Sequence, residues 1–269
     1  MRTINKDLPD MQNSQSEFNI PIKRVGVTNF RLPIFIIQKD NKFQHTISDI
    51  DIFVDLNGDN KGINMSRLPI GLQSYIEAPL NSAVICKIAE DIRIASEATR
   101  CQIIYKFPFF INKKSPVSKL DGLIHYNVIF NLTNTKDSVD FYISVESIGT
   151  SLCPCSKEIS EKQGAHNQRS KVTVECKVKF EMEYLWIEDI VGMIESCYSC
   201  QVYSILKRPD EKFVTMAAYN NPKFVEDIGR ELAYKFQQLN NIEHFDIQVS
   251  NEESIHQHNA YCRLTSKEE

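Results

Sequence analysis

Alternating apolar and polar positions predict β-strands at several places along this 269-residue chain. Within residues 45–56 the later apolar side chains fall on every second position, and aspartates occupy most positions between them. Because successive side chains of a strand point to opposite faces of a sheet, we expect a half-buried strand there. Residues 24–38, 101–111 and 123–133 carry similar apolar or β-branched runs, and Pro33 indicates an edge or a bulge in the earliest of them.

Two helices are expected between these strands. The first spans about residues 64–78 and is stopped by Pro79, which cannot continue a helix. The second follows Asn81 and Ser82, which are good N-cap residues, and its apolar side chains recur at helical spacing. Residues 21–136 are therefore expected to carry the element order ββααββ.

The same order of elements is expected again in residues 137–269. Its helices are expected near residues 186–197 and 222–239, the latter with Asn221 as N-cap and Pro222 at the first helical position. Its strands are expected at residues 138–148, 172–182, 245–249 and 255–262. The repeat is one of pattern, because the two halves share no convincing residue-by-residue identity.

These patterns predict an α+β protein built from two tandem modules, each an antiparallel sheet with helices on one face. The modules would occupy residues 21–136 and 137–269, and the polar residues 1–20 are expected to form a flexible N-terminal arm. A four-stranded sheet leaves two open edges, which proteins usually pair or cover. We therefore expect the protein to assemble with itself into closed barrels.

The composition narrows the range of functions. A formal net charge of −4 provides no basic field for wrapping nucleic acid, so a small phosphorylated molecule met by a local group of Lys and Arg fits better. Eight cysteines are too few for a disulfide framework in a chain of this length. The chain shows no apolar run typical of a signal peptide or a membrane span. We expect a cytoplasmic protein with reduced thiols and no nucleic-acid or membrane partner.

The chemistry is expected in residues 151–170, SLCPCSKEISEKQGAHNQRS. Cys153 and Cys155 lie on either side of Pro154, which restricts the backbone and directs one thiol, and His166 follows in a polar loop. A thiolate and an imidazole are good ligands for a borderline-soft divalent ion. The alternative is that the cysteines are small buried hydrophobes. A structural zinc site would need a second ligand pair nearby, and since none is present, the site looks open.

SLCPCSKEIS and GAHNQRS resemble the signature of the GTP cyclohydrolases of type IB. These are metal-dependent bacterial enzymes that catalyse the first step of pterin synthesis. Further motifs agree in the same order, and together they cover nearly the whole chain: LPDMQ, GINMSR, KRPDEKFVT, NNPKFVEDIGREL and ESIHQHNAYC. The family commonly has His where this chain has Asn64, so no polar role is expected at that position. The resemblance implies tandem tunnelling-fold modules in a homotetramer, with active sites where subunits meet.

The resemblance also implies a metal centre of Cys153, His166 and Glu211. Without it, Asp210 and Glu211 look like an exposed turn of mixed charge. A thiolate, an imidazole and a carboxylate would neutralise a dication and suit an open catalytic site for Zn, Mn or Fe(II). Cys153 is therefore expected to be both a metal ligand and a catalytic residue.

Glu226 has two interpretations. Helix physics alone favours an acidic residue placed to suit the helix dipole. A carboxylate can also accept two parallel hydrogen bonds from the N1–H and 2-amino group of guanine, and the resemblance places the family's guanine-binding glutamate here.

Further residues are candidates for proton transfer and for binding the triphosphate of a nucleotide. His256 and His258 lie two apart on a predicted strand and would share a face, and the resemblance points to Glu253 and His256 as proton-transfer groups. The triphosphate would be met by arginines in the matched motifs: Arg67, Arg169 and Arg208.

The expected function is therefore that of a GTP cyclohydrolase, which converts GTP and water to 7,8-dihydroneopterin triphosphate and formate. A metal ion would lower the pKa of the water that attacks C8 of guanine. The alternatives are a non-catalytic module that binds a guanine nucleotide or pterin, a nitrile reductase of the same fold, and an archaeal-type cyclohydrolase that yields a cyclic phosphate.

Overall fold

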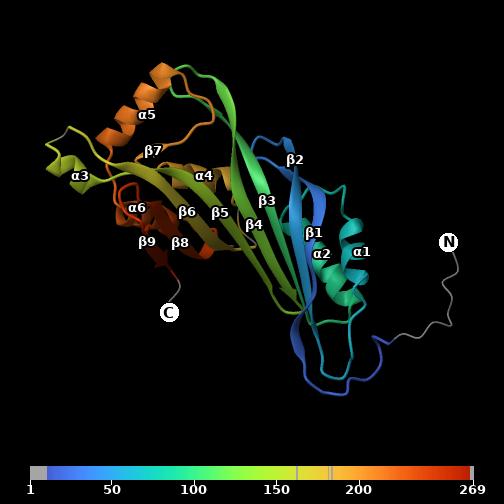
Figure 1. Ribbon diagram of the computed structural model, residues 1–269. Coiled ribbons are helices and arrows are strands. Elements are labelled where there is room, and N and C mark those ends of the chain that lie inside the picture. The colour runs from blue at the N-terminus through green and yellow to red at the C-terminus, as the bar shows by residue number, and fades with distance from the viewer. Residues whose placement is uncertain (1–10, 162, 181, 183, 267–269) are drawn as a thin grey trace.

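One antiparallel sheet runs through the protein and joins its two halves (Figure 1). The computed structural model describes residues 11–161, 163–180, 182 and 184–266. The strands are β1 (Ile22–Ile37), β2 (Phe43–Leu56), β3 (Arg100–Lys114), β4 (Asp121–Thr135), β5 (Val139–Leu152), β6 (Asn167–Val178), β7 (Cys200–Gln201), β8 (Ile242–Glu252) and β9 (Ala260–Thr265). The helices are α1 (Arg67–Gln73), α2 (Ser82–Ala95), α3 (Pro154–Ile159), α4 (Ile187–Glu195), α5 (Arg208–Asn220) and α6 (Val225–Gln237).

The first half has the expected order of β1, β2, α1, α2, β3 and β4, which confirms the first ββααββ pattern. The Asn81 side chain caps α2 by accepting the N–H of Val84 at 2.9 Å. Ile85, Ile88 and Ile92 then fall on the buried face of that helix. Helix α1 is shorter than expected, because it ends at Gln73 and leaves the residues before Pro79 in turns.

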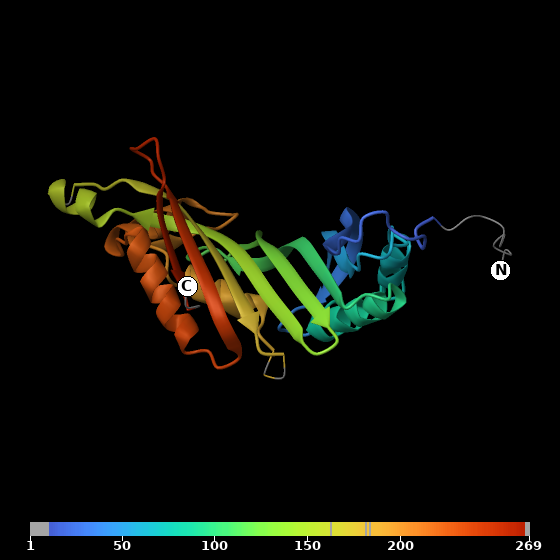
Figure 2. The ribbon, with the colours of Figure 1, turned by 90° about the horizontal axis from the view of Figure 1, so that it is seen from below.

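The two halves share a hairpin. Strands β4 and β5 pair directly, with Phe130 opposite Ile143, and the turn between them is closed by the N–H of Thr135 on the carbonyl of Ser138 at 2.9 Å. The expectation that each half has two open edges is therefore wrong at the inner edges. The outermost strands of the described sheet are β1 and β9. Figure 2 shows the helices of the first half, in teal, and of the second half, in orange, at opposite ends of this sheet.

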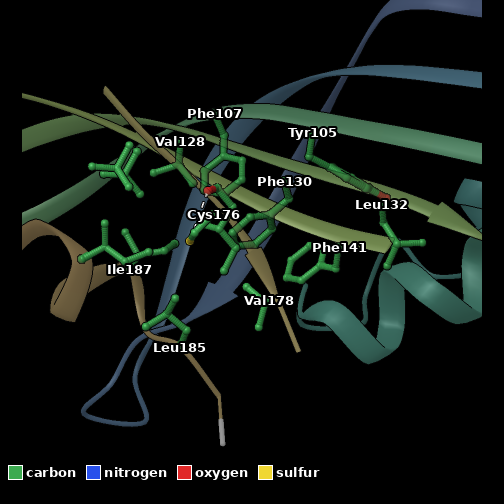
Figure 3. Packing of buried hydrophobic residues seen from close by; sticks show 14 of the residues in the cluster. Tyr105, Phe107, Val128, Phe130, Leu132, Phe141, Cys176, Val178, Leu185 and Ile187 are labelled. Atoms are coloured by element: carbon green, nitrogen blue, oxygen red, sulfur yellow. Dashed lines mark hydrogen bonds between the residues drawn. The ribbon is translucent and has the colours of Figure 1, made fainter. Parts of the chain in front are cut away.

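One hydrophobic core extends along the helix-bearing face of the sheet and includes residues from both halves. The ring of Phe130 packs edge to face against Phe107 and Phe141, with centroids 5.1 and 5.4 Å apart, as Figure 3 shows. Burying a side chain of this size stabilises the fold by about 1.5–3 kcal/mol. The alternating positions on the other face are polar, as with Gln102 and Asn131, whose amides hydrogen bond at 2.9 Å. Alternation in the sequence therefore predicted both faces.

The second half departs from the simple pattern. It contains the expected pairs of strands and helices but adds α3, the short β7 and α5. Strand β6 covers residues 167–178, so it begins and ends earlier than the expected 172–182. Strand β9 begins at Ala260, and His256 and His258 lie in the loop before it, so their placement on a strand is wrong.

Helix α6 begins at Val225, three residues later than expected. Asp227 accepts the N–H of Phe224 at 2.9 Å and so closes the first turn. Asn221 is not its N-cap, because its side-chain amide donates to the carbonyl of Tyr198 at 3.0 Å. A polar residue before proline resembles a cap in the sequence, whereas here Asn221 fastens the segment before α6 to the loop between α4 and β7.

Part of the N-terminal arm lies against the first half. Residues 1–10 fall outside the described residues, so the expected flexibility of 1–20 concerns only 11–20 here. The N–H of Ser16 donates to the carbonyl of Asp59 at 2.9 Å, and that of Lys61 donates to Ser14 at 3.0 Å. No helix within the described part of the chain has the length and apolar character needed to cross a membrane.

Candidate active site

A cavity of about 280 Å³ lies where β5 and β8 end and β6 begins, beside the N-terminus of α6. Five residues expected to act in catalysis or binding line it: Cys153, His166, Glu226, Glu253 and His256. They are spread over more than a hundred positions of the chain. The antiparallel pairing of β5, β6 and β8 brings the segments at the strand ends together, and the N-terminus of α6 adds Glu226.

Cys153 enters the cavity because β5 ends just before it and α3 begins just after it. It is the N-cap of α3, with Pro154 at the first helical position, and its Sγ accepts the N–H of Ser156 at 3.4 Å. Cys155 is exposed and lies outside the cavity lining. The two thiols of the motif therefore differ in position, and Cys153 is the one that can meet a ligand in the cavity.

His166 is fixed to the same turn through its backbone. The N–H of Cys153 donates to the carbonyl of His166 at 3.1 Å, and the N–H of His166 donates to Oγ of Ser156 at 3.1 Å. The loop between β5 and β6 is thereby closed at its base. The thiol and the imidazole consequently line one cavity although the loop between them shows no apolar periodicity.

Gln168 connects His166 with Glu253. Its Oε1 lies 2.8 Å from Nδ1 of His166, and its Nε2 donates to Oε1 of Glu253 at 3.2 Å. A direct contact is longer, because Nδ1 of His166 and Oε2 of Glu253 are 3.8 Å apart. All three side chains are largely buried, with 14% of His166 and 11% of Glu253 exposed.

A second polar group forms another wall of the cavity. Nδ2 of Asn251 donates to Oγ of Ser151 at 2.9 Å, and Ser151 donates to the carbonyl of Lys223 at 2.8 Å. Oδ1 of the buried Asn251 has no hydrogen-bond partner among the described residues. A buried acceptor without a partner usually binds water or a ligand N–H.

Lys223 is already engaged at the cavity wall. Its ammonium pairs with the carboxylate of Glu231. Burial alone would raise the pKa of Glu231, but the hydrogen bond and charge of Lys223, together with Lys235, hold that pKa below its usual range. Lys223 is the only Lys or Arg among the described residues that line this cavity.

Glu226 lies exposed in the first turn of α6 and lines the cavity. Since Asp227 already closes that turn, Glu226 is not needed as a cap. His256 and His258 also line the cavity, and their rings stack with centroids 5.1 Å apart and an interplanar angle of 14°. The carboxylate and the two imidazoles therefore border the same space.

Four expected residues do not join this cavity within the chain. Arg67 lies in the first half and donates to the carbonyl of Ala95 at 2.9 Å. Arg169 follows Gln168 on β6, points to the opposite face and lines a different cavity. Arg208 and Glu211 are exposed in the first turn of α5.

Asp210, beside Glu211, is fully buried, so the expectation of an exposed turn is wrong at this position. Its carboxylate accepts the N–H groups of Val117, Ser118 and Lys207 at 2.7 to 2.9 Å and the hydroxyl of Ser118. Burial would raise the pKa of Asp210, but the Ser118 hydroxyl and these N–H groups lower it well below its usual range. Asp210 thus fastens the start of α5 to the loop between β3 and β4.

The predicted metal ligands are only partly assembled. Within residues 11–161, 163–180, 182 and 184–266, no three His, Cys, Asp or Glu side chains converge closely enough to hold a metal ion. Cys153 and His166 share the cavity, and Glu211 lies apart from them on α5.

Gln168, Asn251 and Lys223 were not among the site residues expected from the sequence. Gln168 stands two positions after His166 within the GAHNQRS motif, so strand periodicity could have placed the two on one face. Asn251 and Lys223 carried no such signal, because their roles depend on pairing between β6 and β8 and on the start of α6.

Comparisons with known proteins identify the family of this chain. Residues 8–262 match the family model described as type I GTP cyclohydrolase folE2. Curated proteins named GTP cyclohydrolase FolE2 are similar over nearly their whole length. The protein of Fervidobacterium nodosum is 43% identical, covering 97% of this chain and 98% of the relative, and that of Thermosipho africanus is 40% identical, covering 96% and 97%.

Among solved structures, uricase from Arthrobacter globiformis superposes with a TM-score of 0.54 at 9% identity, covering 92% of this chain and 94% of the uricase. At that identity the likeness concerns the fold alone, which is the tunnelling fold. The family model and the curated relatives, by contrast, match in sequence over ranges that include the residues lining the cavity. The chain belongs to the family of type I GTP cyclohydrolases described as folE2.

Proposed function

We propose that the protein is a GTP cyclohydrolase that converts GTP and water to 7,8-dihydroneopterin triphosphate and formate, the first step of pterin and folate synthesis. One observation supports this most directly. The cavity gathers a thiol, imidazoles and two carboxylates from the motifs that mark the family. A module that only binds a nucleotide has no need of this combination.

A divalent ion fits two of the donors in the cavity. A thiolate at Cys153 and an imidazole at His166 suit Zn, Mn or Fe(II), and Gln168 engages Nδ1 of His166, so Nε2 remains for a ligand. When bound, such an ion would lower the pKa of water for attack on C8 of guanine. Catalytic zinc sites usually have three protein ligands, so one more donor is required.

We assign the third ligand to Glu211 of a neighbouring copy in a homotetramer. Glu211 is exposed on α5 and lies outside the cavity of its own chain. Arg67 and Arg208 are also outside, and the described cavity has no free Lys or Arg for a triphosphate. A neighbouring copy would supply both the missing carboxylate and the missing positive charge.

The residues of this chain would divide the remaining work. Glu226 would accept the N1–H and 2-amino group of guanine, and no capping duty competes with that role. Glu253 and His256 would transfer protons at the opening imidazole ring and at the departing formate.

The test of the activity is formate release from GTP by protein reloaded with Zn, Mn or Fe(II), with the pterin product identified by mass. Turnover that is lost on chelation and returns with metal is expected, and ATP serves as the control substrate. A cyclic phosphate product would favour the archaeal-type reaction. GTP binding without formate would favour a binding module.

The shared site can be tested by mixing two inactive variants, Cys153→Ala and Glu211→Ala. If the metal centre combines residues from two copies, mixed tetramers regain part of the activity, because some sites contain neither substitution. A mixture that stays inactive after subunit exchange would place Glu211 in the site of its own chain. Light scattering is expected to show a tetramer, and an active monomer would refute the shared arrangement.

A further inference from the structure

Gln168 lies between two residues of the proposed chemistry. It is the second residue of β6, stands opposite Ser151 of β5 in the sheet, and is only 7% exposed. Its amide contacts Nδ1 of His166 at 2.8 Å and Oε1 of Glu253 at 3.2 Å. A buried side-chain amide with both ends engaged cannot turn over without breaking both contacts.

The direction of this amide follows from its partners. An ionised carboxylate can only accept hydrogen bonds, so the NH₂ group of Gln168 must face Glu253. The carbonyl oxygen then faces His166, and because that oxygen can only accept, Nδ1 of His166 must carry a proton. In a neutral imidazole the lone pair consequently lies on Nε2.

We propose that Gln168 is a positioning residue that holds His166 in the Nδ1–H tautomer and at the same time orients Glu253. This inference rests on the proposed function only in taking His166 as a ligand and Glu253 as a proton-transfer group. Histidines that bind metals generally donate their other ring N–H to a fixed acceptor, which orients the ring. Here one amide would hold the metal side and the proton-transfer side of the cavity in a fixed relation.

Two substitutions separate the two contacts. Gln168→Glu retains an acceptor for Nδ1–H of His166 but places a second carboxylate against Glu253. Gln168→Met keeps the length of the side chain and removes both contacts. Gln248→Met on β8 is the matched control, because Gln248 is exposed and its amide bonds only to Asp246 at 3.1 Å among the contacts described.

The first measurement needs neither metal nor GTP. In metal-free protein labelled with ¹⁵N-histidine and held at pH 8.5, where an ordinary imidazole is neutral, two-bond ¹H–¹⁵N spectra identify the protonated nitrogen. We expect wild type, Gln168→Glu and Gln248→Met to show His166 protonated on Nδ1, and Gln168→Met to show a mixture. The His166 signals are assigned by their loss in His166→Asn.

The second measurement compares metal affinity with turnover. Gln168→Met is expected to bind Zn about 10- to 100-fold more weakly, as for the loss of other groups that orient a metal ligand. Gln168→Glu is expected to keep its metal affinity within a few fold but to lose at least tenfold in kcat, because Glu253 is disturbed. KM for GTP should change little in both variants, since Glu226 is untouched.

A residue that merely fills space would not produce this division between the two variants. His166 protonated on Nε2 in wild type would overturn the proposal, as would a Gln168→Met protein with wild-type spectrum and metal affinity. Thermal unfolding shows whether Gln168→Met has lost its fold. If it has, the proposal is tested with Gln168→Glu alone. If no variant or wild type turns over GTP, the proposed function fails, whereas the tautomer and the metal affinity still decide the role of Gln168.

Discussion

The connection between the first and second strands is built differently in the two halves. In the first half, β1 and β2 are joined by a tight turn in which the N–H of Gln38 donates to the carbonyl of Lys42 at 2.8 Å. In the second half, the corresponding strands β5 and β6 are joined by residues 153–166, which include α3 and carry Cys153 and His166. The sheet and the helix pair are alike, so it is the lengthened connection that brings a thiol and an imidazole to the cavity.

The helices show a similar difference. In the first half α1 and α2 lead directly back to β3, whereas in the second half β7 and α5 are inserted between α4 and α6. In this insertion Glu211 is exposed on α5, whereas the neighbouring Asp210 is buried and anchors the helix. The comparison teaches that the additions carry Cys153 and Glu211, whereas Glu226 and Asn251 lie on α6 and β8, which have counterparts in the first half.

The largest expected effect concerns the lengthened connection itself. Cys153→Ala removes the thiol in the cavity and should lower formate release by at least roughly 10³-fold, together with loss of bound metal. Cys155→Ala is the matched control, because that thiol is exposed outside the cavity, and it should keep most activity and metal. Metal analysis and formate assays check both, and equal losses in the two variants would remove the distinction between the thiols.

The next effect concerns recognition of guanine at the start of α6. Glu226→Gln keeps the size of the side chain but turns one acceptor into a donor that faces another donor, so GTP should bind at least roughly tenfold more weakly. ATP should bind poorly to wild type, because adenine has no 2-amino donor and no proton on N1. Calorimetry at equal metal occupancy measures both, with Glu90→Gln on α2 of the first half as control. Unchanged GTP affinity would return Glu226 to a simple helix-terminus charge.

A third prediction compares one anchoring aspartate in each half. Asp210 holds α5, and Asp55 accepts the N–H groups of Thr99 and Arg100 at 2.9 and 2.8 Å. Asp210→Asn and Asp55→Asn should each lower the thermal midpoint by roughly 5 °C or more. Only Asp210→Asn should also weaken metal binding, because it loosens the helix that carries Glu211. Equal metal affinity in both variants would argue against that link.

The same aspartates give a pH dependence. Burial would raise the pKa of Asp55, but the hydroxyl of Thr99 and the N–H groups nearby lower it, and the pKa of Asp210 is also lowered. A carboxyl whose folded pKa lies below its unfolded value contributes stability above about pH 4 and loses it as the pH falls further. The difference between wild type and either Asn variant should therefore shrink below about pH 4 in urea titrations.

The smallest effect concerns the contact between the halves. The ammonium of Lys39, in the tight turn, lies 2.5 Å from the carboxylate of Asp189 on α4, and its N–H donates to Glu188 at 2.9 Å. Both partners of the ion pair are about half exposed, so Lys39→Ala should cost about 0.5 kcal/mol in urea unfolding. A cost above roughly 2 kcal/mol would mean that this contact contributes substantially beside the β4–β5 pairing and the bonds from Asp210 to Val117 and Ser118, which also join the halves.

Much of the fold could be predicted because alternation reports burial directly. Strands β3 and β4 alternate over their length, and the apolar stripe of α2 is regular and well capped. Helix α5 was missed because its first turn consists of charged residues, and nothing local distinguishes the buried Asp210 from the exposed Glu211. Burial of Asp210 depends on N–H groups from residues 117 and 118, which are far away in the chain.

The residues of the candidate site that belong to recognisable sequence motifs were predicted. Those that meet only through strand pairing were missed. The motif around Cys153 and His166, together with the family resemblance, led to the residues that line the cavity. The strand expected through His256 was wrong, because two histidines at spacing two also occur in a loop whose rings stack. Gln168 becomes visible as a link only when β6 lies beside β8 and brings Glu253 within reach.

The pairing of β6 with β8 has a consequence for the time course of folding. Most neighbouring strands are joined by short hairpins, whereas α4, β7, α5 and α6 all intervene between β6 and β8. Closing so long a loop costs entropy before its contacts form, so non-local pairings of this kind are slow. Because Gln168 and Glu253 come together only through this pairing, a refolding chain should regain most of its sheet before it regains the cavity. Partial unfolding in the reverse direction would abolish catalysis while the first half still remains intact.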